Sequence, residues 1–181
     1  MPDLLVGAYN QVVGGSAVGA ATLLRGAWLK TLAPKAIEAG KAPTNLTSMV
    51  ESGSGLQLTV HGLAAAGQFG YGVALVPSFE TDGRAAILVG APNGATGGTQ
   101  LSGGAELLRW QKTGKNPGLA PWPWLAIAGE SPRPGSRFGQ SLSAASQKGQ
   151  SVFAVGAWLA TPHKSEQLDQ GAVYADRLPS P

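Results

Sequence analysis

Short runs in which apolar residues alternate with small or polar ones, separated by Gly-rich turns, dominate the chain. The clearest is residues 56–61, Leu-Gln-Leu-Thr-Val-His. A period of two is typical of a β-strand with one buried face. Similar runs follow at residues 71–75 and 140–144. The pattern predicts many short strands joined by tight turns, and hence an all-β fold.

One group of motifs recurs along the chain. Three segments share the ending Val-Gly-Ala, and they occupy residues 4–8, 87–91 and 153–157. Each leads to a second Gly-Ala that opens a further apolar run, at residues 19–24, 104–109 and 171–174. A Phe-Gly pair, Phe69-Gly70 or Phe138-Gly139, precedes the second and third copies. Because the motifs keep the same order, the sequence contains a tandem repeat.

Each full unit is predicted to hold four antiparallel strands. The first strand follows the Phe-Gly pair, the second ends at Val-Gly-Ala, and the third begins at the second Gly-Ala. The fourth is predicted at residues 56–61 in the first unit and 122–127 in the middle unit. The expected units are residues 1–66, 67–135 and 136–181, with about three, four and three strands. An insertion at residues 33–54 interrupts the first unit as a short helix or long loop, either functional or a tolerated surface insertion.

Four-stranded antiparallel units repeated at this interval are typical of β-propeller blades. Small Gly-Ala pairs suit strands crowded around a central channel, and a Phe before Gly can wedge between neighbouring sheets. We therefore expect a partial β-propeller of consecutive four-stranded antiparallel blades. Since propellers close with about four to eight blades, the chain is expected to be a fragment or an assembly subunit.

These motifs resemble the FG-GAP repeat family, which forms the blades of the integrin α-chain propeller and of many bacterial surface proteins. The residues that carry the resemblance are Phe69-Gly70 with Gly90-Ala91-Pro92, and Phe138-Gly139 with Gly156-Ala157. The resemblance implies a non-catalytic interaction or scaffold module for protein or glycan contacts. It also implies a place outside the cell, at the cell surface or in the periplasm. Two alternatives stay open: an accessory propeller of a larger hydrolase and a calcium-dependent adhesion domain.

Composition and charge narrow the function classes. The chain has 27 Gly and 13 Pro among 181 residues, which argues against a helical bundle because both residues destabilise helices. Its net charge is +3 and its 13 cations are spread thinly, whereas nucleic-acid binders need a stripe of cations, so no nucleic-acid partner is expected. The absence of Cys excludes disulfides and thiolate metal sites. No apolar run approaches the ~20 residues of a membrane span, and no signal-peptide pattern opens the chain.

The turn before the middle Val-Gly-Ala strand is the candidate metal site. In the family this turn often carries an Asp-x-Asp-x-Asp-Gly calcium loop, and here Ser78, Glu80 and Asp82 keep the alternate spacing. Only two of the three are carboxylates, although calcium takes about six to eight oxygen ligands. The equivalent turn of the third unit, residues 146–150, has no carboxylate. The pattern therefore favours an ordinary turn, and no cofactor is expected.

No motif of nucleophilic, metalloprotease or phosphate-binding type is present, and the chain is expected not to be an enzyme. Trp122 and Trp124, in a Pro-rich stretch, are candidates for a recognition surface, or alternatively fill space between adjacent blades.

The two end blades are expected to leave sheet faces uncovered. Only 13% of the residues are charged, and large exposed apolar patches usually mark interfaces. We therefore expect contact with another polypeptide that completes the propeller or belongs to a larger assembly. The residues predicted to contribute apolar surface to these faces, or to the adjoining blade core, are Leu4, Val6, Phe153 and Val155.

Overall fold

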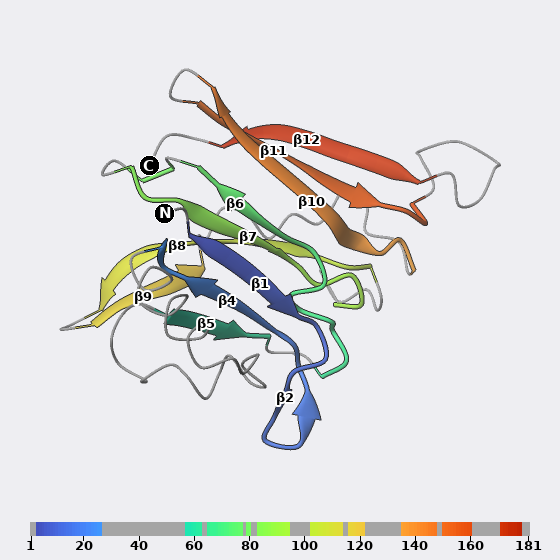
Figure 1. The fold of residues 1–181 in the computed structure, drawn as a ribbon. Coiled ribbons are helices and arrows are strands. Elements are labelled where there is room, and N and C mark those ends of the chain that lie inside the picture. The colour runs from blue at the N-terminus through green and yellow to red at the C-terminus, as the bar shows by residue number, and fades with distance from the viewer. Residues whose placement is uncertain are drawn as a thin grey trace, which may run out of the picture.

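A computed structural model describes residues 3–26, 57–62, 65–77, 79–80, 83–94, 102–113, 116–121, 135–147, 150–160 and 171–178. These residues form an all-β structure in which every strand pairing is antiparallel. Three main sheets lie side by side with their faces in contact (Figure 1). The all-β prediction is confirmed. Within the described residues the sheets form an open stack, and none closes into a ring.

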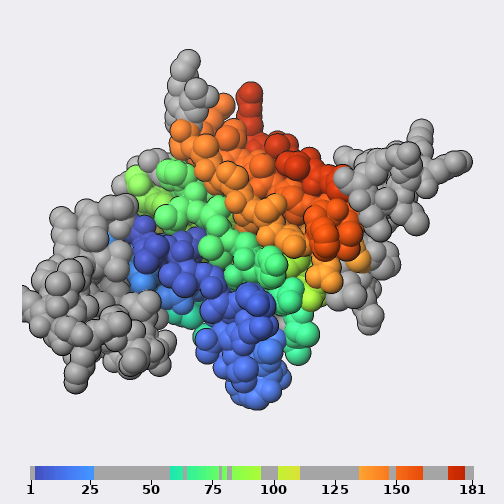
Figure 2. All heavy atoms as spheres, turned by 45° about the vertical axis from the view of Figure 1, so that its right-hand side comes forward, coloured from blue at the N-terminus to red at the C-terminus, as the bar shows by residue number. Residues whose placement is uncertain are grey.

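The sheets follow one another along the chain. The first sheet has the order β1 (Leu4–Ala8), β4 (Ala20–Leu24) and β5 (Gln57–His61). The middle sheet consists of β6 (Val73–Val76), β7 (Ala86–Gly90), β8 (Ala105–Thr113) and β9 (Asn116–Pro121). The third sheet consists of β10 (Phe138–Gln147), β11 (Gln150–Ala157) and β12 (Ala172–Leu178). The same order runs across the surface from blue through green to red in Figure 2. Among the described residues, the three main sheets have the predicted three, four and three strands.

The fourth strand of the middle sheet departs from the prediction. It is β9, which pairs with β8 and begins six residues before the predicted segment 122–127, itself outside the described residues. Pro117 and Pro121 within β9 argue against a strand in the sequence. However, β9 lies at the sheet edge, where proline is tolerated because a missing N–H leaves no ladder bond unmade. The predicted insertion at residues 33–54 also lies outside the described residues.

A small hairpin that the sequence analysis did not predict connects β1 to β4. It consists of β2 (Val12–Val13) and β3 (Ser16–Ala17). Its two turn residues, Gly14 and Gly15, have φ values of 58° and 84°. Two successive positive φ angles are characteristic of the type I′ turn, which matches the twist of a two-residue hairpin.

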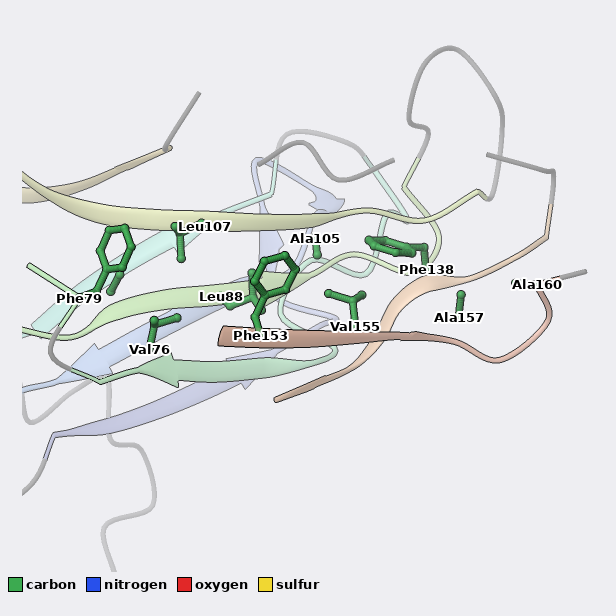
Figure 3. Packing of buried hydrophobic residues seen from close by; sticks show 11 residues of the cluster. Val76, Phe79, Leu88, Ala105, Leu107, Phe138, Phe153, Val155, Ala157 and Ala160 are labelled. Carbon is green, nitrogen blue, oxygen red and sulfur yellow. The ribbon is translucent and has the colours of Figure 1, made fainter. Parts of the chain in front are cut away.

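Two hydrophobic cores hold the three sheets together, and we call them the first and second junctions. The first junction lies between the first and middle sheets, and its buried members are Ala21, Leu23, Phe69, Ile87, Val89, Leu108 and Trp110. The second lies between the middle and third sheets and includes Val76, Phe79, Ala86, Leu88, Ala105, Leu107, Phe138, Phe153, Val155, Ala157 and Ala160 (Figure 3). Because β7 contributes alternate residues to both, the middle sheet is buried on both faces.

Candidate functional site

The sheets approach one another most closely at glycines of the repeat. In the first junction, a Cβ atom on Gly7 of β1 would overlap the carbonyl oxygen of Gly70. In the second junction, a Cβ atom on Gly90 of β7 would overlap the carbonyl oxygen of Gly139. Equivalent residues of the repeat thus make equivalent contacts. Glycine is needed at Gly7 and Gly90 because any side chain there would push two backbones apart.

A second glycine completes each contact. Gly19 and Gly103, with φ of 79° and 81°, form isolated parallel bridges with Phe69 and Phe138 respectively. Both phenylalanines are buried, with exposed fractions of 6% and 3%. The predicted wedge of Phe between neighbouring sheets is therefore found. We call each pair of glycines that receives a Phe-Gly turn a Phe-Gly socket.

Strand register locates the second glycine within the repeat. Gly7 pairs with Ala21, and Gly90 pairs with Ala105. The glycine two residues before this partner is Gly19 in the first sheet and Gly103 in the middle sheet. The sequence alignment placed Gly104 at this position, one residue too late, because it compared Gly-Ala pairs rather than strand partners.

The third sheet has the same two glycines without a described occupant. Gly156 pairs with Val173, so the glycine two residues earlier is Gly171, whose φ is 72°. The nearest atoms to a Cβ on these glycines belong to Ser141 and Trp158 of the third sheet's own repeat unit. We call this pair the third socket. The third socket was not predicted as a site, although the alignment of Gly156 with Gly90 in the repeat points to it.

The third socket lies in an open hollow on the outer face of the third sheet. The hollow has a volume of about 440 Å³ and is lined by Ser141, Gly156, Ala157, Trp158, Gly171, Ala172 and Val173. Trp158 is 56% exposed and Val173 is 76% exposed, which is unusual for such large apolar side chains. A neighbouring hollow of about 380 Å³ extends the same face over Val152, Ala154 and Ala175. This surface, which we call the third outer face, is concave and largely apolar.

The first sheet exposes apolar residues at the opposite end of the stack (Figure 1). Leu4 and Val6 of β1 are 46% and 37% exposed. The repeat aligns them with Ile87 and Val89 of β7, which are fully buried in the first junction. We call the surface around Leu4 and Val6 the first outer face. Its apolar residues are of the kind that form a junction, but no described sheet packs against them.

The other two residues predicted for the end faces, Phe153 and Val155, lie elsewhere. Both are buried in the second junction, which corresponds to the adjoining core that the sequence analysis also allowed. The physical reason is the direction of the stack. Val155 aligns with Val6, and equivalent residues of a tandem stack face the same way. Only one of them can therefore lie at an end of the stack.

Glu80, one of the candidate calcium ligands, takes part in a partly buried ion pair with Arg109. Its Oε2 accepts a hydrogen bond from Nη2 of Arg109 at 2.7 Å, and its Oε1 accepts from Nε of Arg109 at 3.3 Å. Oε1 also accepts from the backbone N–H of Trp110 at 3.0 Å. The Glu80 side chain is 6% exposed. Both carboxylate oxygens therefore link the β6–β7 turn to β8, which is a structural role.

Trp110 is held beside this ion pair by two cations. The guanidinium carbons of Arg25 and Arg84 each lie 4.9 Å from its ring centroid. The indole N–H donates to the carbonyl oxygen of Ala85 at 2.9 Å. Arg25 in turn contacts Asp3 at 3.5 Å. The cation–π contact of Arg25 ties the first sheet to the middle sheet, and such a contact is worth about 0.5–1 kcal/mol, or more when desolvated.

The remaining predicted site residues, Ser78, Asp82, Trp122 and Trp124, lie outside the described residues. Among the residues that the structure does describe, no three His, Cys, Asp or Glu side chains gather as a metal site would require. The same residues include no helix long and apolar enough to cross a membrane.

Glu106 of β8 is a partly buried carboxylate with a shifted pKa. Burial raises its pKa above the ordinary value, because desolvation disfavours the charged form. The folded protein therefore binds a proton more readily than the unfolded chain, so this group opposes folding once pH rises above its unfolded pKa. We expect Glu106→Gln to raise the melting temperature at neutral pH, and the gain to vanish below about pH 4, where both states are protonated. Thermal denaturation of both proteins over this pH range measures the effect, and a gain independent of pH would contradict it.

Comparison with models of known protein families and with characterised proteins found no match. The functional interpretation therefore rests on the repeat and its geometry. The chemistry available at the two outer faces is apolar packing and backbone contact, which suits the binding of another polypeptide.

Proposed function

We propose that this chain is a non-catalytic interaction or scaffold module, and that its three sheets are consecutive blades of an FG-GAP-type β-propeller. In this proposal both outer faces pack against another polypeptide, which completes the propeller or belongs to a larger assembly. We also propose, from the resemblance to FG-GAP repeats, that the module acts outside the cell, at the cell surface or in the periplasm.

The observation that carries the proposal is the difference in exposure between equivalent residues. Ile87 and Val89 are fully buried by the first sheet, whereas Leu4 and Val6 at the same repeat positions are exposed. On the third outer face, Val152 is 37% exposed, whereas its equivalent Ala86 is fully buried. Soluble monomers rarely expose contiguous apolar surface of this kind unless it binds a partner. Burial of such surface stabilises a complex by about 25 cal/mol per Å² before the costs of association are subtracted.

Sedimentation velocity of the purified chain over a micromolar concentration range tests the proposal. We expect the uncovered faces to cause concentration-dependent association, which Val6→Lys should weaken because it places a charge on the first outer face. Ser16→Lys, at an exposed position of β3, is the matched control and should leave association unchanged. A well-folded, strictly monomeric chain at all concentrations would refute the proposal.

A further inference from the structure

We propose that the third socket binds a Phe-Gly turn carried by a partner polypeptide. This inference rests on the proposed function and names the chemistry of the partner: an aromatic ring followed by a residue without a side chain. The ring would cover Gly171 and Val173, and the backbone of the following glycine would lie against Gly156.

The two occupied sockets define what the third can accept. In each, the first glycine contacts the carbonyl oxygen of the incoming glycine, and the second bridges to the backbone of the incoming phenylalanine. The second glycines have nearly the same left-handed conformation in all three sheets, with φ of 79°, 81° and 72°. Gly171 thus keeps the backbone geometry of the occupied sockets, although the atoms nearest to a Cβ placed on it belong to Trp158 of its own repeat unit. At Gly156 the hydroxyl of Ser141 lies close to where the carbonyl oxygen of the incoming glycine lies in the occupied sockets, so it has to rotate away when the occupant enters.

The side chains around the third socket are larger than those of the occupied second socket, where Gly72 and Ala105 flank Gly90. The row Ser141, Gly156 and Val173 crosses β10, β11 and β12 in register. Val173 is equivalent in the repeat to Ala105 of the second junction. Ala105 packs in the same hydrophobic cluster as Phe138. Val173 and the adjacent Trp158 are apolar and exposed, so an aromatic ring placed there would remove both from water.

A second copy of this chain does not supply the turn. The sequence contains two Phe-Gly pairs, Phe69-Gly70 and Phe138-Gly139. Both phenylalanines are buried in the chain's own junctions, and extracting either would expose a core residue. The occupant therefore carries a Phe-Gly pair other than these two, at the start of a strand.

A synthetic peptide with the sequence of residues 67–76, which contains Phe69-Gly70 and opens β6, serves as the probe. It carries a fluorophore and is titrated with the intact chain while fluorescence anisotropy is recorded. We expect saturable binding that weakens at least about tenfold when the peptide contains Gly70→Ala, because the added Cβ would strike the socket backbone. In NMR spectra of the chain, the indole N–H signal of Trp158, assigned through Trp158→Phe, should shift on binding.

Two matched variants of the chain locate the binding site. Val173→Glu places a charge in the socket at a position that is 76% exposed, so the fold is retained and peptide binding should fall at least about tenfold. Val12→Glu makes the same change at a 57% exposed position of the β2–β3 hairpin and should bind as the unmodified chain does. Absence of saturable binding, or equal binding by Val173→Glu, would overturn the proposal. If one of these two results is obtained and the chain still associates in sedimentation, the third socket does not bind a Phe-Gly turn, but the proposed function stands.

Discussion

Gly90→Ala should destabilise the protein by about 3 kcal/mol, whereas the equivalent Gly156→Ala should change stability by less than about 1 kcal/mol. Neither glycine has a positive φ, so alanine fits the local backbone at both positions. The difference lies in what the new methyl group meets. At Gly90 it overlaps the carbonyl oxygen of Gly139, and relief requires separation of the middle and third sheets. At Gly156 it meets the hydroxyl of Ser141, which can rotate away.

Urea denaturation followed by circular dichroism measures both changes. The comparison has a built-in control, because the two substitutions are chemically identical and occupy the same repeat position. Equal destabilisation by the two variants would show that the close approach of the sheets at Gly90 does not govern stability. Complete unfolding of Gly90→Ala alone agrees with the prediction, since about 3 kcal/mol is a large part of a typical domain's stability.

The strands could be predicted from the sequence wherever the repeat fixes them. Val-Gly-Ala marks the same strand in all three sheets because its glycine must admit a neighbouring backbone, and this requirement recurs at Gly7 and Gly90. β9 could not be located in this way. Its prolines contradict strand propensity, and only its edge position, which is a property of the assembled sheet, makes them acceptable.

The candidate sites were predictable only in part. Leu4 and Ile87 have the same apolar character, so the sequence alone cannot tell which of them is covered by a neighbouring sheet. Glu80 was a candidate calcium ligand only through local spacing, and the pattern favoured an ordinary turn. The partner of Glu80 is Arg109, 29 residues further along the chain, and only the pairing of β7 with β8 brings the two together.

Glu80→Ala should lower the free energy of unfolding by about 2–3 kcal/mol, because it removes the buried carboxylate that accepts from Arg109 and from the Trp110 N–H. Glu80→Gln should cost less, since an amide oxygen can still accept from the Trp110 N–H. Urea denaturation of both variants gives the two values, and Arg109→Met alone and combined with Glu80→Ala completes a double-mutant cycle. A coupling energy above about 1 kcal/mol is expected.

The calcium-ligand interpretation of the same residue makes a different prediction. If Glu80 served mainly to bind calcium, a chelator would lower the melting temperature of the unmodified chain and leave that of Glu80→Ala unchanged. The ion pair instead predicts that Glu80→Ala loses the same stability with calcium and with chelator, because Arg109 and Trp110 already engage both carboxylate oxygens. Thermal denaturation of the two proteins under both conditions separates these outcomes. A calcium-dependent difference between them would overturn the structural role of Glu80.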